Sequence, residues 1–272
     1  MNWLESLFYG LFTGFSEFVP VSSRAHGAIL RYLFGYEFDA LQAVMVHLGA
    51  LLGLLICCRQ MLGKFIYEVR VTKRYSRTRS ARGTLRGTYD LHLVKIAFVP
   101  MLLTLLVYSA GDRWENDRLI LTVFLILNGI VLYVTDHMRQ GNKDAKMMSG
   151  LDSIGIGLFS IFSAFPGMSR FGGNVIFAVM RGADKQKAVT WAILLSIPAL
   201  ILLMLMELIS VLSGGAVLAG FLCYLFTAAG SFIGAYLGVL LVRTVAVRAG
   251  FSGYAYYCWG VAIFCFVLYL IV

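Results

Sequence analysis

Two apolar stretches of this chain are each broken near the middle by the same short polar pattern, and these breaks constrain the fold most. The first break reads Glu17-Phe-Val-Pro-Val-Ser-Ser-Arg-Ala-His26, and the second reads Pro166-Gly-Met-Ser-Arg-Phe-Gly-Gly-Asn174. Both contain Pro-x-x-Ser-Arg. A membrane-spanning helix needs about 20 consecutive apolar residues, and the apolar halves beside each break are shorter than that. Each stretch, 4–33 and 154–180, therefore predicts a re-entrant helical hairpin whose polar tip is shielded from lipid.

The composition indicates that these hairpins belong to a membrane protein. Of 272 residues, 60% are hydrophobic and 14% are charged, whereas a soluble domain carries about 25% charged residues. A large soluble domain is therefore disfavoured. The net charge of +9 would suggest nucleic acid in a soluble protein. Here the basic residues lie mainly in short loops between apolar runs. We therefore expect them to set the orientation of the protein in the membrane, and we expect no nucleic-acid partner.

The rest of the chain contains further segments that are long and apolar enough to cross a bilayer. There are six of them: 40–58, 93–110, 119–135, 188–208, 216–242 and 254–272. The predicted fold is an all-α integral membrane protein with six transmembrane helices and two re-entrant hairpins. Oligomeric state cannot be read from the lipid-facing composition, and a homo-oligomer is compatible with it.

Basic residues predict the orientation of the helices. The segment 59–89, predicted as a loop, contains nine Lys or Arg and one acid, Glu68. Short loops rich in Lys and Arg stay in the cytoplasm. Segment 111–118 and the predicted turn 207–215 then fall on the opposite side, together with both termini.

The order of these elements predicts an internal repeat within one polytopic domain. Residues 1–135 and residues 150–272 each contain one hairpin and three spans. An odd number of spans puts the two halves in opposite orientations. Inverted repeats of this kind bring their interrupted helices together near the bilayer midplane, where binding sites form.

Four ionisable side chains fall at membrane depth in the two breaks: Glu17, Arg24, His26 and Arg170. Such groups are costly there and mark functional sites by default. The alternative is that Glu17 and Arg24 form a buried structural pair. That alternative leaves Arg170 unexplained, and it leaves three hydroxyl groups unexplained, those of Ser22, Ser23 and Ser169.

Two arginines beside glycine-containing turns favour an anionic ligand. The planar guanidinium matches the oxygens of a phosphate group. Backbone N–H groups at the starts of half-helices add further donors. Gly167, Gly172 and Gly173 would let a ligand approach the backbone closely. The sequence therefore predicts a site for a phosphate-like group.

The nucleophile is left open by the residue types alone. His26 would serve as nucleophile or as acid and base near neutral pH. Ser23 would serve as nucleophile if His26 or Glu17 activates it. The other histidines are weaker candidates. His47 lies inside a predicted span, and His92 and His137 are expected at solvated loop edges.

At these residues the chain resembles the undecaprenyl-diphosphate phosphatase family, bacterial membrane enzymes linked to bacitracin resistance. The resemblance covers nearly the whole chain and includes both motifs, together with Leu48-Gly49, Pro100 and Ser196-Ile-Pro198. It implies the same fold and a hydrolase acting on a phosphorus anhydride. The substrate would be a polyprenyl diphosphate lipid, cleaved at the outer face of the bacterial plasma (inner) membrane. The product, undecaprenyl phosphate, would return to peptidoglycan synthesis for the cell wall.

The resemblance also assigns roles by position. Glu17 matches the second acid of a Glu/Gln-x-x-x-Glu motif, and Arg170 would grip the diphosphate beside Ser169. Catalytic roles are implied for Glu17, Ser23, His26 and Arg170. Substrate binding is implied for the remaining motif positions: Thr13, Ser22, Arg24, Gly167, Ser169, Gly172 and Asn174.

Four positions depart from the family pattern. Thr13 stands where the motif has its first acid, so the chain lacks a carboxylate that would bind a divalent cation. The residues therefore do not decide whether Mg²⁺ or Ca²⁺ is required. Phe171 replaces a serine beside Arg170. Asn174 replaces a threonine, and Ser160 replaces a glutamine.

Three functions fit these observations. A phosphatase predicts phosphate release that depends on His26 and Arg170. A non-hydrolytic transporter, or flippase, of polyprenyl phosphate predicts lipid binding without phosphate release, and the inverted repeat resembles transporter architecture. A transporter of ions or small solutes would have to retain diphosphate-like residues for another purpose.

Overall fold

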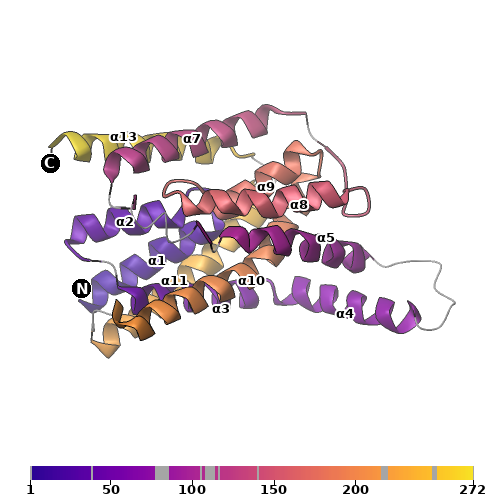
Figure 1. The fold of residues 1–272 in the computed structure, drawn as a ribbon, viewed down its shortest axis with the longest axis horizontal. Coiled ribbons are helices and arrows are strands. Elements are labelled where there is room, and N and C mark those ends of the chain that lie inside the picture. The colour runs from indigo at the N-terminus through magenta and orange to yellow at the C-terminus, as the bar shows by residue number, and fades with distance from the viewer. Residues whose placement is uncertain are drawn as a thin grey trace.

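The computed structural model describes residues 2–37, 39–76, 86–104, 106, 107, 114, 115, 117–139, 141–215, 220–246 and 250–271. These residues fold into helices (Figure 1). Within the described ranges, β pairing is limited to one isolated bridge between Lys143 and Ala183. The all-α prediction is therefore confirmed.

Within the described residues, five helices are long and apolar enough to cross a membrane. They are α3 (Ala40–Cys57), α7 (Arg118–His137), α10 (Lys185–Ser210), α11 (Phe221–Leu241) and α13 (Ser252–Ile271). Two of them end in π-helical turns, η2 (Val211–Gly215) after α10 and η3 (Val242–Ala246) after α11. The sixth predicted span, 93–110, overlaps α5 (Arg86–Met101), and residues 105 and 108–110 of that span lie outside the described residues.

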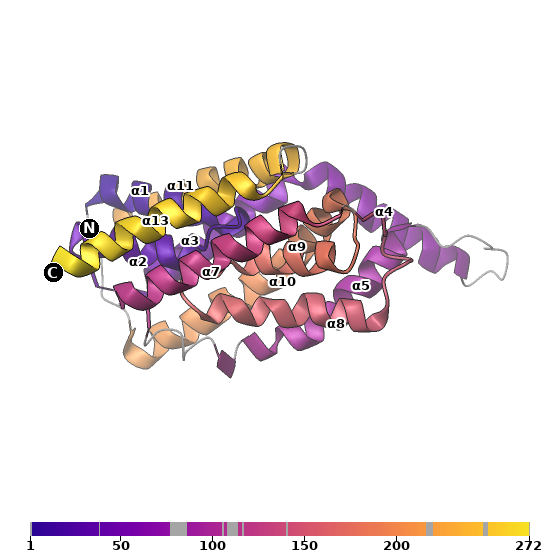
Figure 2. The same ribbon diagram turned by 90° about the horizontal axis from the view of Figure 1, so that it is seen from above.

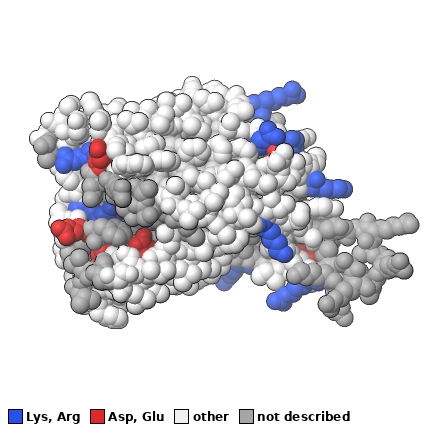
Figure 3. Space-filling view, in the orientation of Figure 1, with Lys and Arg blue, Asp and Glu red and all other residues white. Residues whose placement is uncertain are grey.

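Charged side chains gather at the two ends of the molecule, with an uncharged band between them in the view of Figure 3. The two termini lie at one end, and Lys and Arg dominate the visible charge at the other (Figure 1, Figure 3). Large apolar side chains are exposed on the helices, including Phe221, Ile263 and Leu270. A surface of this kind is typical of a protein that faces lipid.

The first break separates α1 (Trp3–Phe18) from α2 (Ser23–Phe34). Pro20 lacks the N–H that a continuing helix would need. Ser22 has a φ of +73°, a left-handed conformation that is uncommon for a residue with a side chain. Its hydroxyl accepts a hydrogen bond from the N–H of Ala25 at 3.4 Å and so caps α2.

The second break separates α8 (Gly150–Leu158) and its 3₁₀ extension η1 (Phe159–Ala164) from α9 (Arg170–Met180). Gly167 has a φ of +112°, and a Cβ there would lie 2.7 Å from the Cβ of Phe124. Both conditions require glycine. Ser169 caps α9, because its hydroxyl accepts from the N–H of Gly172 at 3.1 Å.

The two breaks meet inside the molecule. The N–H of Gly167 donates to the hydroxyl of Ser22 at 3.1 Å. Asn128 of α7 joins both breaks: its Nδ2 donates to the carbonyl of Pro20 at 2.9 Å, and its Oδ1 accepts from the N–H of Ser169 at 3.2 Å. The echoed motifs are therefore in direct contact, as the sequence predicted.

Close helix packing fixes α1, which carries Glu17 at its last turn. A Cβ at Gly14 would lie 2.4 Å from the carbonyl oxygen of Ser231 in α11, so the two backbones touch there. Small residues permit this approach between membrane helices. Elsewhere α7 and α13 run side by side (Figure 1, Figure 2).

Two segments differ from the sequence predictions. Most of the expected loop 59–89 is helical, as α4 (Arg59–Ser76) and the start of α5, while residues 77–85 are outside the described ranges. Apolar residues at 61, 62, 65, 66 and 69 recur at helical spacing, and this amphipathic pattern explains the helix. The predicted start of the turn 207–215 is also wrong, because α10 continues through the buried Glu207 to Ser210. No glycine or proline interrupts the chain between Pro198 and Gly214.

Candidate active site

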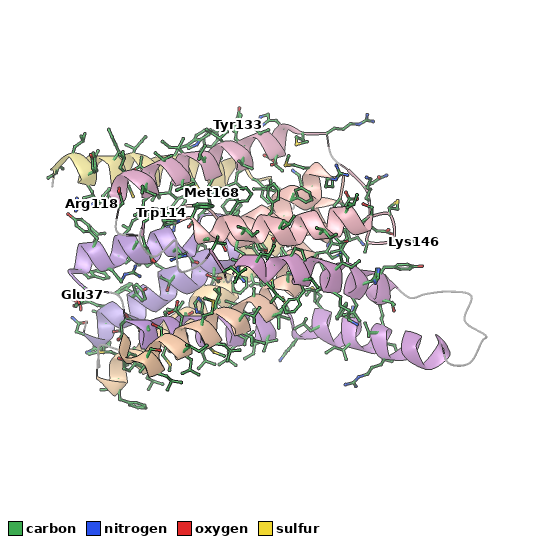
Figure 4. The ribbon with its side chains drawn as sticks, viewed as in Figure 1. Glu37, Trp114, Arg118, Tyr133, Lys146 and Met168 are labelled. Atoms are coloured by element: carbon green, nitrogen blue, oxygen red, sulfur yellow. The ribbon has the colours of Figure 1, made fainter. Side chains whose placement is uncertain are left out.

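A cavity lies where the two breaks meet. Its walls come from α1, α2, α3, α9 and α10, together with Glu115. Met168, one of the lining residues, lies between Arg118 and Lys146 along the long axis of the molecule, nearer to Arg118 (Figure 4). The polar residues that line the cavity are Tyr9, Thr13, Ser16, Glu17, Ser23, Arg24, Arg31, His47, Glu115, Ser163, Ser169, Arg170 and Glu207.

The centre of this cavity is a buried carboxylate that joins three helix ends. Glu17, in the last turn of α1, accepts a hydrogen bond from the hydroxyl of Ser23, the first residue of α2. Its other oxygen forms an ion pair with Nη2 of Arg170, the first residue of α9. The side chains of Glu17 and Arg170 are each 6% exposed. The structure thus brings together three of the four predicted catalytic residues.

Arg170 keeps one donor unused. Its Nη1 is buried and has no hydrogen-bond partner within the described residues. A buried donor without a partner costs about 1–3 kcal/mol, and such groups are rare in native proteins. Because Arg170 lines the cavity, this cost indicates a place for an acceptor such as a phosphate oxygen.

His47 of α3 also lines the cavity, although the sequence ranked it low. It is buried, and its Nδ1 has no hydrogen-bond partner in the described part of the chain. A lone histidine in an apolar span has no neighbours in sequence that mark it as functional. The signal that could have identified it is its depth in the membrane, the same criterion that selected Glu17.

His26 lies outside the cavity lining. Its Nδ1 is 2.7 Å from the carbonyl oxygen of Ser22, and its Nε2 is 2.7 Å from the hydroxyl of Tyr257 in α13. The two rings stack with centroids 5.6 Å apart. Residues four apart share a helix face, so Ser23 and Gly27 face the cavity together. His26 is rotated from Gly27 by about 100° around α2, and its catalytic role stays a prediction.

The proposed structural pair between Glu17 and Arg24 is wrong. Arg24 lines the cavity, and its Nη2 instead contacts Glu115 at 3.1 Å. The second oxygen of Glu115 contacts Nη2 of Arg31 at 2.7 Å. Burial raises the pKa of Glu115, but the guanidiniums of Arg24 and Arg31 lower it more, so its pKa lies below the usual glutamate value. Packing decided this pairing, because Glu115 is distant in sequence from both arginines.

Comparison with known proteins identifies the family. The family model described as "Bacitracin resistance protein BacA" matches residues 6–264. The chain belongs to the BacA family. Undecaprenyl-diphosphatase 2 of Halalkalibacterium halodurans is 26% identical, over 98% of this chain and 96% of that protein. Undecaprenyl-diphosphatase 1 of Shouchella clausii is 27% identical over the same shares. The undecaprenyl-diphosphatase of Methanococcus maripaludis strain C5 is 27% identical over 94% of this chain and 96% of that protein.

The five long apolar helices among the described residues make this BacA protein a multi-pass membrane protein.

The remaining predicted residues of the two motifs either hold the backbone of the breaks in place or line the cavity. Ser22 and Gly167 bond each other across the breaks, and Ser169 both lines the cavity and caps α9. Gly172 supplies the capped N–H. These roles hold the reacting groups in place.

Two departures from the BacA pattern contact each other. The hydroxyl of Ser160 donates to Oδ1 of Asn174 at 2.8 Å, and both side chains are buried. The pattern implied by the resemblance has an amide at position 160 and a hydroxyl at position 174, and this chain has the hydroxyl at 160 and the amide at 174. Asn174 therefore bonds within the second hairpin and does not line the cavity. The fourth departure, Phe171, is buried and packs edge-on against Phe18 at 6.3 Å between centroids.

The described residues of the BacA site offer no preformed set of carboxylate or imidazole ligands for Mg²⁺ or Ca²⁺. Among the described residues, no three His, Cys, Asp or Glu side chains lie close enough together to hold an ion. Thr13 lines the cavity, but its hydroxyl donates to the carbonyl of Tyr9 at 2.6 Å. Both oxygens of Glu17 are already engaged. Hard cations need several free oxygen ligands.

Proposed function

We propose that this BacA protein hydrolyses undecaprenyl diphosphate to undecaprenyl phosphate and orthophosphate. The observation that carries the proposal is that Arg170, whose Nη1 has no partner among the described residues, lines the cavity where Glu17 accepts the hydroxyl hydrogen of Ser23. The names of the curated relatives support the same substrate. A non-hydrolytic carrier would have no use for a hydroxyl held against a buried carboxylate, so the flippase alternative is not favoured.

In the first step, Ser23 is the nucleophile. Its Oγ attacks the terminal phosphorus while its proton passes to Glu17, the nearest acceptor. The Oγ–P bond forms, and the bond from that phosphorus to the bridging oxygen breaks. Undecaprenyl phosphate leaves with the electron pair. Arg170 keeps Glu17 ionised and offers its free Nη1 to the phosphoryl oxygens.

In the second step, water cleaves the phosphoserine. The water oxygen attacks phosphorus, and the bond between phosphorus and Ser23 breaks. Glu17 returns its proton to the departing Oγ. Both hydrogens of the water end on the orthophosphate, so the enzyme is restored and the charges balance.

We propose six spans and two re-entrant hairpins in an inverted repeat of residues 1–135 and 150–272. The contact between the two breaks supports this arrangement.

The protein would lie in the bacterial plasma membrane, and its site would open to the outer side of that membrane. A second cavity, lined by Glu37 and Arg118 near the termini, shares Arg31 and Glu115 with the site. The opposite end is the more basic one (Figure 3), which favours the cytoplasm.

The polyprenyl chain would occupy an apolar groove beside the cavity. Phe12, Phe15 and Tyr254 line this groove, and Ser16 lines both the groove and the cavity. A lipid whose head reached Arg170 would therefore have an apolar surface for its tail. The groove is also where the His26–Tyr257 pair lies.

The test is phosphate release from undecaprenyl diphosphate by purified protein, with and without magnesium or calcium. We expect release by the parent protein and its loss in Ser23→Ala and Arg170→Ala. Arg181→Ala is the matched control, because Arg181 caps the opposite end of the same helix α9 and its side chain is 52% exposed. Lipid binding with no release at any cation concentration would establish the carrier instead.

A further inference from the structure

His47 has a buried ring nitrogen without a partner among the described residues, whereas the other buried polar side chains of α3 and its N-cap are paired. At the N-cap, Asp39 accepts from the hydroxyl of Tyr224 at 2.8 Å. Gln42 donates to the hydroxyl of Thr227 at 3.2 Å. Only 8% of His47 is exposed, and its Nδ1 has no partner among the described residues. Its environment therefore differs from that of its neighbours in α3.

Two buried nitrogens without a partner in the described part of the chain belong to side chains that line the same cavity. One is Nδ1 of His47 and the other is Nη1 of Arg170. Each carries a desolvation cost that a hydrogen bond would remove. Their residues come from different helices, α3 and α9, and line the same cavity as Ser23. A single ligand with several acceptor oxygens would satisfy both, and a phosphate group has this chemistry.

A phosphate bound in this site would be stabilised by a second hydrogen-bond donor in addition to Arg170. The charge of Arg170 is balanced by Glu17 in their ion pair. A terminal phosphate brings further negative charge to the same place, next to the carboxylate. Buried anions are stable only when hydrogen bonds or opposite charges compensate them. Arg24 and Arg31 also line the cavity and contact Glu115, and a donor on α3 would add to the compensation that Arg170 provides.

We propose that His47 is a further catalytic residue, which donates a hydrogen bond to the terminal phosphate from the side of α3 while Arg170 donates from α9. The proposal rests on the proposed phosphatase function and deepens it. It assigns the recognised ligand as a phosphate group, either that of the lipid substrate or the orthophosphate product.

The test compares His47→Leu, which removes the donor, with His47→Gln, which keeps an N–H donor. The probes are undecaprenyl diphosphate for turnover and orthophosphate as a competitive inhibitor. We expect His47→Leu to raise the inhibition constant of orthophosphate and to lower kcat/KM, each about 10- to 100-fold, the range for a hydrogen bond to a charged group. His47→Gln should recover most of both losses. His92→Leu, at an exposed position outside the cavity, should change neither.

A melting experiment separates this role from a structural one. Removing a buried polar group that has no partner is neutral or stabilising, so the Tm of His47→Leu should equal or exceed that of the parent. A lowered Tm with equal damage in His47→Gln would overturn the proposal. So would an inhibition constant in His47→Leu within about twofold of the parent.

The proposal and the proposed function can fail separately. If the parent releases no phosphate, the phosphatase function is wrong. Calorimetric binding of orthophosphate to the parent and to His47→Leu then still decides the role of His47. Equal affinity of the two proteins would overturn it, and weaker binding by His47→Leu would support it.

Discussion

The hydroxyl of Ser23 donates a hydrogen bond to the carboxylate of Glu17, six residues earlier and on the other side of a helix break. An uninterrupted helix would place residues six apart on different faces. The break at Pro20 turns α2 back toward α1, so the two side chains meet at the buried junction of two helix ends. In the proposed mechanism, this contact pairs a serine nucleophile with its base within residues 17–23.

Ser23→Ala and Glu17→Gln should each lower kcat by about 10²–10⁴-fold, because each removes one half of a nucleophile and base that act together. The double variant should be little worse than the worse single variant, since residues that act as a unit are strongly non-additive. The measurement is the rate of phosphate release at saturating lipid. Additive losses would show that the two residues act independently.

Asn128→Leu should destabilise the protein and reduce activity. Asn128 bonds both breaks, at Pro20 and at Ser169, and its loss leaves a buried carbonyl and a buried N–H without partners. Each such group costs about 1–3 kcal/mol. The Tm in detergent and kcat/KM should fall together. Asn142→Leu, at an exposed position, is the control, and an equal loss there would contradict the argument.

The Ser160–Asn174 hydrogen bond predicts coupling between two departures from the family pattern. Ser160→Ala and Asn174→Ala should each cost about 1 kcal/mol or more, because each leaves a buried polar group unpaired. Ser160→Asn combined with Asn174→Ser exchanges the two residues and keeps one amide and one hydroxyl at the same total volume. The double variant should be more stable than the sum of its single variants predicts. Additive melting shifts would exclude the coupling.

Glu115→Gln should lower stability in a manner that depends on pH. The pKa of Glu115 is below that of an unfolded glutamate because Arg24 and Arg31 surround it. The ionised carboxylate therefore stabilises the fold above the unfolded pKa of about 4.3, and this contribution is lost as the pH falls through the folded pKa. The difference in Tm between the parent and Glu115→Gln should be largest near neutral pH and should shrink in acid. A difference that does not change with pH would contradict the ion-pair role.

The sequence by itself determined most of the helices and selected three of the residues that meet where the two breaks join. Apolar run lengths define the long helices, and Pro20 and Gly167 mark where the other two apolar stretches break. Because the breaks end helices beside Glu17, Ser23 and Arg170, local chemistry was enough to select these three residues. The repeated Pro-x-x-Ser-Arg pattern also predicted that the two breaks would meet.

Only the tertiary structure decided which groups face one another. Glu17 pairs with Arg170, 153 residues away, and not with Arg24 seven residues away. His26 turns toward Tyr257, while His47 enters the cavity from α3. The rotation of a helix about its axis depends on the packing of all its neighbours, so a sequence motif can place a residue on a helix without fixing what that residue contacts.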